Sequence, residues 1–170
     1  MSFDNTRLLD FLSEIDKELK RKMVLVAVGG TAMTLLKAKS STLDLDFTIQ
    51  SQYYDDFKTA KDILQPGFRV DLFHDGAVFV NMLPVDYMKK SKPVKTKFKN
   101  IELRTLNPVD IVVTKIGRLD DRDEQDIKSC VKKFKITKRQ IVNRAGQMES
   151  STHDKTFQKN LQKVLKKLYK

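Results

Sequence analysis

Apolar and polar residues follow β-type patterns in three segments of the first half of the chain. Residues 24–28 form a short apolar run, whereas residues 44–49 and 68–73 alternate between polar and apolar side chains. Successive side chains of a strand point to opposite faces, so Asp44 and Asp46 share one face. The alternation predicts half-buried strands, and we expect the three strands to lie side by side in one sheet.

Other segments space their apolar residues three or four positions apart, which predicts amphipathic helices. These segments are residues 3–20, 31–39, 53–64 and 155–168. Asn107-Pro108 predicts the start of another helix, because asparagine caps helices and proline suits their first turn. A capping box at Thr137 and Gln140 predicts a helix that ends at Gly146. Shorter strands are expected at 78–80, 85–88, 94–99 and 101–106.

Together these elements predict an α+β fold, in which a mixed β-sheet flanked by helices is followed by a helical C-terminal region. Charge divides the chain in the same way. Residues 1–127 carry 20 basic and 20 acidic residues, whereas residues 128–170 carry 13 basic and 2 acidic residues. We therefore predict a core over 1–127 and a basic helical region over 128–170, packed on or beside the core. Such an asymmetry indicates a polyanionic partner.

Composition limits the expected cellular compartment and the chemistry that cysteine can contribute. No apolar run approaches the ~18 residues of a membrane span, and the N-terminus lacks the pattern of a signal peptide. A cytoplasmic protein without membrane contact is expected. The single cysteine, Cys130, excludes an internal disulfide and a cysteine-based metal site. Its lysine neighbours could activate the thiol, but a buried, inert position on a helix is the expectation.

A glycine pair follows the apolar run and opens a segment of helical composition. Gly29, Gly30 and Thr31 stand at this turn. Backbone N–H groups at the start of a helix, beside glycines that leave space, form a site for an anion, most commonly phosphate. The turn therefore predicts a nucleotide-binding element at the edge of the sheet.

Carboxylates follow shortly after this turn. Asp44 and Asp46 lie about 6.5–7 Å apart along a strand, a spacing that allows them to ligate one or two hard cations, Mg²⁺ or Mn²⁺. Asp71 lies in the middle of the strand at 68–73, where acids are disfavoured. If its strand neighbours 44–49, Asp71 becomes a third ligand. The alternative is that these acids are solvated residues of an outer face.

Gly-Gly-Thr, twelve residues and then Asp-x-Asp resemble the signature of the polymerase-β-like nucleotidyltransferase superfamily. The segment GGTAMTLLKAKSSTLDLDFTI is most similar to the small prokaryotic branch with the AbiEii-type and MenT-type toxins. The resemblance covers roughly residues 20–130. It implies that Asp44, Asp46 and Asp71 bind two Mg²⁺ ions and that a nucleoside triphosphate rests on Gly29, Gly30 and Thr31.

A second motif lies on the helix that Asn107 opens. By itself, Lys115 on this apolar helix either reaches out to water or meets an anion. The run LNPVDIVVTKIGR followed by DRDEQDI is similar to the second signature of the AbiEii-like branch. The resemblance implies that Lys115 lies near the nucleotide phosphates and that Asp110, Asp123 and Asp126 match the motif's acids, with Asp126 at the nucleotide.

The motifs predict a Mg-dependent enzyme that moves a nucleoside monophosphate from a nucleoside triphosphate to a hydroxyl. The resemblance to the toxin branch implies an RNA acceptor, such as a tRNA 3′ end, and a separately encoded antitoxin. A P-loop kinase and a Rossmann enzyme are excluded by their missing glycine motifs. The alternative is an inactive module of the same fold that binds RNA or a protein.

Two lysine-rich segments leave their role open. The six lysines of residues 89–99 either protect an edge strand from aggregation or contact phosphate. The basic helix at 155–168 either packs on its own domain, binds RNA or lies on a membrane, the last being the least favoured. RNA binding through residues 128–170 is the prediction.

Overall fold

The computed structural model describes residues 1–170, apart from the side chains of Ser150 and Thr152. Five strands form a mixed sheet in the order β3-β2-β1-β7-β6. Their bounds are β1 (Met23–Ala27), β2 (Leu45–Ile49), β3 (Val70–His74), β6 (Lys92–Pro93) and β7 (Ile101–Thr105). Pairs β1–β7 and β2–β3 are parallel, and pairs β1–β2 and β6–β7 are antiparallel. The predicted mixed sheet, with its first three strands side by side, is confirmed.

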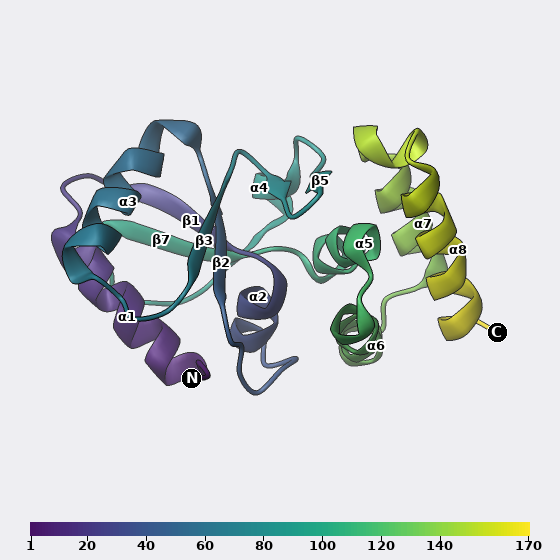
Figure 1. The fold of residues 1–170 in the computed structure, drawn as a ribbon, viewed down its shortest axis with the longest axis horizontal. Helices are drawn as coiled ribbons and strands as arrows, with labels where there is room; N and C mark the ends of the chain where they lie inside the picture. Colours follow the sequence, from purple (N-terminus) through teal and green to yellow (C-terminus); the bar gives the residue numbers. More distant parts are fainter.

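The helices divide between the two ends of the molecule (Figure 1). Those nearer the sheet are α1 (Asn5–Glu18), α2 (Gly29–Leu35), α3 (Ser51–Leu64) and the short α4 (Tyr87–Lys90). Those of the C-terminal part are α5 (Pro108–Arg118), α6 (Asp121–Phe134), α7 (Lys138–Gly146) and α8 (Lys155–Leu168), with the 3-10 turn η1 (Glu149–Thr152) before α8. A small hairpin of β4 (Ala77–Val78) and β5 (Asn81–Met82) lies between the two ends.

Local capping explains where the predicted helices begin. The Asn107 side chain accepts the Val109 N–H at 3.0 Å, directly before α5. Thr137 and Gln140 form the predicted capping box of α7, with N–H···O distances of 2.8 and 3.2 Å. These contacts satisfy backbone groups that the first turn of a helix leaves free. Both predicted helix starts are confirmed.

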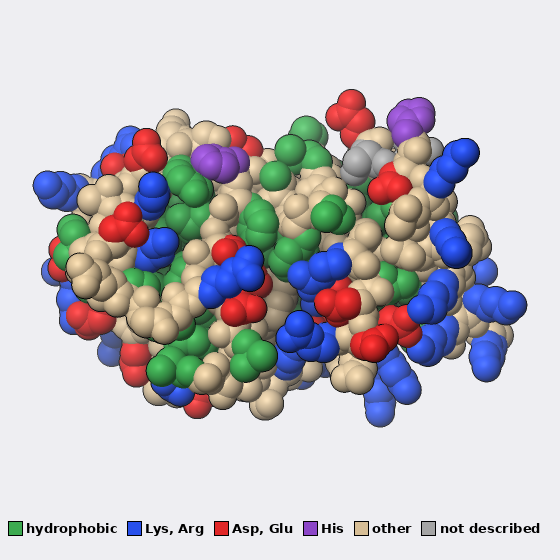
Figure 2. Space-filling view, in the orientation of Figure 1, with side chains coloured by type: hydrophobic (Ala, Val, Ile, Leu, Met, Phe, Trp, Pro, Cys, Tyr) green, Lys and Arg blue, Asp and Glu red, His purple; other side chains and the backbone are tan. Residues whose placement is uncertain are grey.

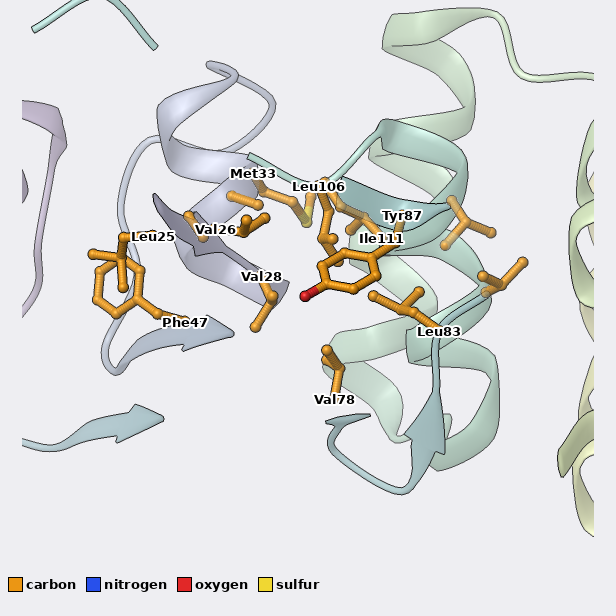
Figure 3. Close-up of a cluster of buried hydrophobic side chains, with 14 of the residues drawn as sticks. Leu25, Val26, Val28, Met33, Phe47, Val78, Leu83, Tyr87, Leu106 and Ile111 are labelled. Carbon is orange, nitrogen blue, oxygen red and sulfur yellow. The ribbon is translucent and has the colours of Figure 1, made fainter. Parts of the chain in front are cut away.

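The central strands are buried on both faces (Figure 3). Val26 and Val28 lie with Met33, Leu106 and Ile111 on one side of the sheet, whereas Leu25 and Phe47 lie on the other. Phe47 packs against Phe57 of α3, with ring centroids 6.2 Å apart. Every residue of β2 is buried, so its prediction as a half-buried strand is wrong. The reason is that helices cover the polar face of β2 as well, which places Asp46 in the interior.

Two predicted strands have another structure. Part of the segment 85–88 enters α4, where the Tyr87 N–H donates to the Pro84 carbonyl at 2.9 Å. Residues 94–98 lie outside the strands, and β6 pairs with β7 only at Lys92 and Pro93. Farther along, the Asp16 carboxylate accepts the N–H groups of residues 99–101 at 2.7–2.8 Å. A side chain therefore satisfies backbone donors that a neighbouring strand would otherwise bind.

The basic C-terminal region is continuous with the rest of the molecule. The predicted boundary at residue 127 falls inside α6. Phe157, Leu161 and Leu165 of α8 are at most 5% exposed, and the Asn160 side chain donates to the Ile116 carbonyl of α5 at 2.8 Å. The apolar stripe of α8 thus packs against the body, while its lysines remain exposed. Within the described part of the chain, no helix combines the length and apolarity needed to cross a membrane.

Candidate functional site

Two of the predicted metal ligands lie opposite each other in the sheet. Asp46 on β2 is the register partner of Asp71 on β3, and neighbouring strands lie about 4.8 Å apart. Asp46 is 8% exposed. Asp44 precedes β2 and is exposed. The parallel pairing therefore brings Asp71 to the face of β2 that carries Asp46, as the alternation predicts.

Thr31 connects the glycine turn to this acidic strand. Its hydroxyl donates to the Asp44 carbonyl at 3.2 Å and accepts the Asp46 N–H at 2.9 Å. The Val28 N–H also donates to the Asp46 carbonyl, at 3.0 Å. Because the Thr31 side chain is fully buried, it holds the Asp-x-Asp backbone in place, and its predicted contact with a nucleotide finds no support in this geometry.

The glycines allow close approach at the start of α2. Gly29 has a φ of +52°, and a Cβ there would lie 2.8 Å from the Phe79 ring and 3.4 Å from the Asp46 carboxylate. At Gly30 a Cβ would lie 2.7 Å from the Thr42 hydroxyl. The turn accordingly requires glycine both for its backbone conformation and for space. This explains the glycine pair independently of any ligand.

Burial and charge act together on Asp46. Burial, followed by the nearby carboxylates of Asp71 and Asp44, raises its pKa from 3.8 to about 6, against the lowering effect of Arg118 and Arg69. Among the described residues, no hydrogen bond or ion pair satisfies the Asp46 side chain. A bound divalent cation relieves this kind of repulsion.

The donor set fits a hard cation, but its present arrangement does not complete a metal site. Oxygen ligands without histidine or cysteine suit Mg²⁺ or Mn²⁺. Within the described residues, no three His, Cys, Asp or Glu side chains are arranged to hold a metal ion. The role of Asp44, Asp46 and Asp71 as a set of metal ligands stays a prediction. In this arrangement Arg69 binds Asp71 through distances of 3.0 Å (Nε to Oδ1) and 2.8 Å (Nη2 to Oδ2).

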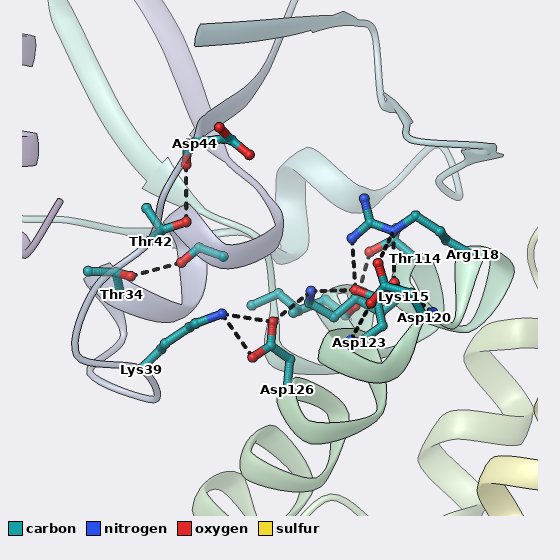
Figure 4. A network of polar contacts seen from close by, with 12 residues as sticks. Thr34, Lys39, Thr42, Asp44, Thr114, Lys115, Arg118, Asp120, Asp123 and Asp126 are labelled. Carbon is teal, nitrogen blue, oxygen red and sulfur yellow. Dashed lines mark hydrogen bonds and ion pairs between the residues drawn. The ribbon is translucent and has the colours of Figure 1, made fainter. Parts of the chain in front are cut away.

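A network of charges from α5 and α6 faces the acidic strands (Figure 4). The Lys115 amine, 3% exposed, lies 2.9 Å from carboxylate oxygens of both Asp123 and Asp126. Lys39 binds the same Asp126 at 3.1 Å and thereby connects the segment after α2 to α6. Lys115 therefore meets anions in the interior, and the alternative that it reaches out to water is wrong.

Arg118 extends this network toward Asp46. Its Nε and Nη2 each lie 2.8 Å from an oxygen of Asp123, and its guanidinium lies 4.4 Å from the centre of the Phe79 ring. Burial opposes ionisation of Asp123, but the hydrogen bonds and charges of Arg118 and Lys115 outweigh it and lower the pKa of Asp123 to about 2. Asp123 is therefore a fixed anion that positions two cations.

The carboxylates of the acidic strands and the charged side chains of this network line one cavity of about 790 Å³ between the sheet and α5 and α6. Its acidic lining is Asp44, Asp46, Asp71, Asp123 and Asp126, and its basic lining is Lys39, Arg69, Lys115, Arg118 and Arg122. Gly30 lines it too, whereas Gly29 and Thr31 do not. Charged side chains of both signs are visible near the middle of the face in Figure 2. We call the side with Asp44, Asp46 and Asp71 the carboxylate wall, although Arg69 also lies there. The side formed by α5 and α6 is called the cationic wall, and its Lys115, Arg118 and Arg122 are accompanied by Asp123 and Asp126.

The family of the chain follows from a match over nearly its whole length. Residues 6–165 match the model of the family described as "Nucleotidyltransferase of unknown function (DUF6036)". The chain belongs to this family. In this nucleotidyltransferase-family protein the matched segment contains both walls of the cavity and most of α8. No curated protein and no solved structure matches the chain.

Sequence reasoning assigned no role to several cations of this site, namely Lys39, Arg69, Arg118 and Arg122. Two of them carried a local signal. Arg118 follows Lys115 by three positions on one helix, and Arg69 precedes Asp71 by two positions, the spacings that place side chains on a shared face. Lys39 had no such signal, because its partner Asp126 lies 87 positions away.

Three other residues lie outside the cavity lining. Asp110, matched to a motif acid, is fully buried and binds Arg144 of α7 at 2.5 and 3.0 Å, so it joins two helices. Cys130 is buried, and burial raises its pKa to about 12, which confirms the expected buried position. His74 is exposed and stacks on Tyr54 at 4.0 Å.

Proposed function

We propose that this protein transfers a nucleoside monophosphate from a nucleoside triphosphate to an acceptor hydroxyl in a Mg²⁺-dependent reaction. The observation that carries the proposal is the cavity in which Asp46 and Asp71, paired in register on neighbouring strands, face Lys115 and Arg118 of α5. Carboxylates on one wall suit cations, and cations on the other suit phosphates. A triphosphate with its metal ions carries both kinds of charge.

Each wall has a distinct task in this reaction. Asp44, Asp46 and Asp71 would hold two Mg²⁺ or Mn²⁺ ions, which when bound neutralise charge on the phosphates and favour ionisation of the attacking hydroxyl. Lys115 and Arg118, both oriented by Asp123, hold the phosphates in line for attack. The acceptor oxygen bonds to the α-phosphorus, the bond to the β-phosphate breaks, pyrophosphate leaves, and Asp71 takes part in removing the hydroxyl proton.

The acceptor is proposed to be RNA, with a tRNA 3′ end as the first substrate to test. Two features support it: the exposed basic side chains of residues 128–170, and the resemblance to AbiEii-type and MenT-type toxins. The same resemblance underlies the proposal of a toxin with a separately encoded antitoxin. The proposal of a cytoplasmic location rests on the composition of the sequence. The proposed nucleotide site also includes Gly29, Gly30, Thr31 and Asp126, of which Gly30 and Asp126 line the cavity.

The test is transfer of label from each α-labelled nucleoside triphosphate to total RNA, with and without Mg²⁺. Asp44→Asn and Asp46→Asn should lower transfer by about 100-fold or more, the size of effect expected when one electrostatic stabiliser is removed. Asp62→Asn, on the exposed side of α3 and outside the cavity, is the matched control and should keep full transfer. Retained transfer in both cavity variants would contradict the proposal.

An inactive binding module of the same fold is the second candidate. The observation that favours it is the ion pair between Arg69 and Asp71, which occupies both oxygens of a proposed metal ligand. A wild-type protein that binds nucleoside triphosphate and RNA but transfers no label from any of the four nucleotides would decide for this candidate.

A further inference from the structure

Arg69 stands directly before β3 and covers a carboxylate of the candidate site. Its guanidinium contacts both oxygens of Asp71, at 3.0 and 2.8 Å. The Arg69 side chain is 70% exposed and that of Asp71 is 30% exposed, and both line the cavity. A divalent cation that takes Asp71 as a ligand must compete with the guanidinium for these two oxygens.

The pair is suited to opening. An ion pair between exposed side chains contributes about 0–1 kcal/mol, and nothing buries Arg69 in its present position. The neighbouring Asp46, by contrast, is buried and has no hydrogen-bonding or ion-pairing group among the described residues. A divalent cation can take both carboxylates as ligands at once, whereas the guanidinium hydrogen-bonds Asp71 and attracts Asp46 only through its charge.

Two other cations of the cavity, Lys115 and Arg118, have partners that a metal ion at Asp46 and Asp71 would leave in place. Lys115 binds Asp123 and Asp126, and Arg118 binds Asp123. These acids lie on α6, on the opposite wall. Arg69 is the cavity cation paired with a proposed metal ligand. When a divalent cation binds Asp71, the Arg69 guanidinium loses its carboxylate partner. It then lies in the cavity that, in the proposed function, binds the triphosphate.

We propose that Arg69 exchanges anions: it pairs with Asp71 in the metal-free protein, and it binds the phosphates of the nucleotide once a divalent cation has taken Asp71. The inference rests on the proposed nucleotidyl transfer and adds a residue to it. A guanidinium fits both partners, because carboxylates and phosphates each accept its two parallel N–H groups. The exchange makes metal and nucleotide each favour the binding of the other, by the same factor.

The experiment measures Mn²⁺ binding by electron paramagnetic resonance and nucleotide binding by calorimetry, using a non-hydrolysable nucleoside triphosphate analogue. Arg69→Gln should bind Mn²⁺ about two- to fivefold more tightly than the wild type when no nucleotide is present, since a competing ion pair of about 0–1 kcal/mol is gone. At saturating Mn²⁺ it should bind the analogue about tenfold more weakly, the loss expected for hydrogen bonds between charged groups. The two changes have opposite signs.

Arg122→Gln is the matched control. Arg122 lines the same cavity, and no ion pair of at most 4.0 Å joins it to Asp71 or to another described side chain. The Arg122→Gln substitution removes the same charge as Arg69→Gln. It should leave the Mn²⁺ affinity of the nucleotide-free protein unchanged. Arg69→Lys is a second variant that keeps the charge but cannot bind two oxygens in parallel, and it should also bind Mn²⁺ more tightly than the wild type.

The outcomes separate the inference from the proposed function. Unchanged or weaker Mn²⁺ binding in both Arg69 variants overturns the competition, and full affinity for the analogue in Arg69→Gln overturns the exchange. A tighter Mn²⁺ affinity in Arg122→Gln as well reduces the effect to general charge and also overturns the inference. A wild-type protein that binds neither Mn²⁺ nor the analogue overturns the proposed function and, with it, the role of Arg69.

Discussion

At the scale of single residues, the ionised form of Asp46 is unfavourable for the stability of the fold but is the form that the proposed chemistry requires. Burial, with the nearby Asp71 and Asp44 carboxylates, raises its pKa to about 6. The native protein therefore holds a proton on Asp46 at pH values where the unfolded chain has lost it. Ionised Asp46 therefore destabilises the metal-free fold, whereas in the proposed function the same negative charge binds a cation.

The sign of this effect gives a prediction for Asp46→Asn. Between the ordinary pKa of 3.8 and the native value of about 6, the native state binds more protons, so stability falls as the pH rises through this range. Above this pH range, ionised Asp46 lowers the free energy of unfolding by its full amount, about 3 kcal/mol. In the presence of a chelator, Asp46→Asn should be more stable than the wild type at pH 8 by up to this amount, and the gain should vanish near pH 4.

Urea denaturation of both proteins at a series of pH values measures this difference. Asp62→Asn on α3 is the control, because Asp62 is exposed and should show no such dependence. A stability difference for Asp46→Asn that is the same at pH 4 and pH 8 would show that the substitution acts by packing and not through ionisation of Asp46.

At the scale of elements, the last helix supports the candidate site indirectly. Phe157 of α8 is fully buried, and Asn160 of α8 binds the carbonyl of Ile116 in α5 at 2.8 Å. Helix α5 also carries Lys115 and Arg118, which form the cationic wall of the cavity. The packing of α8 therefore contributes to holding that wall in place.

Phe157→Ala should accordingly lower the free energy of unfolding by about 3–5 kcal/mol, the usual cost of removing a buried phenyl ring. Lys159→Ala on the exposed side of the same helix should change it by less than about 0.5 kcal/mol. The denaturation midpoints in urea give both values. A loss below about 1 kcal/mol for Phe157→Ala would mean that α8 contributes little to the stability of the fold.

At the scale of the whole molecule, the excess of positive charge lies apart from the candidate site. The excess of basic residues lies in residues 128–170, and Figure 2 shows basic side chains gathered at the helical end of the molecule. Two of the α8 lysines, Lys163 and Lys167, pair with Glu124 of α6. The remaining lysines of α8 are exposed and belong to no ion pair among the described residues, which leaves them available to phosphates.

Binding of single-stranded RNA should therefore weaken with salt. Neutralisation of about 4–6 phosphates gives a log–log slope near −3 to −4, from roughly −0.7 per phosphate. A variant with glutamine at Lys155, Lys159, Lys166 and Lys170 should bind more weakly, with a shallower slope. The matched control replaces Lys89, Lys95, Lys97 and Lys99 by glutamine, which removes the same amount of charge outside residues 128–170. If the control loses the affinity and the α8 variant keeps it, the RNA surface lies on residues 89–99.

Local features of the fold were predictable from the sequence because they depend on neighbouring residues. Alternation at 44–49 placed Asp46 on a strand face, and the caps at Asn107 and Thr137 marked helix starts, since each involves contacts within about four residues. The glycine pair and Asp-x-Asp also pointed to the nucleotidyltransferase family. The strand prediction for residues 85–88 was wrong because local hydrogen bonds, such as that from the Tyr87 N–H to the Pro84 carbonyl, form the short helix α4 there. Near the end of the predicted strand at 94–99, the backbone N–H groups of residues 99–101 bind the distant Asp16 carboxylate.

The tertiary structure alone decided which charges meet. It placed Asp71 in register with Asp46, gave Lys115 two acidic partners on α6 and joined Lys39 to Asp126. It also buried the polar face of β2, which raises the pKa of Asp46. A sequence specifies which residues carry charge and which way a local element turns them. The partner of each charge, and its exposure to water, depend on how elements far apart in the chain pack together.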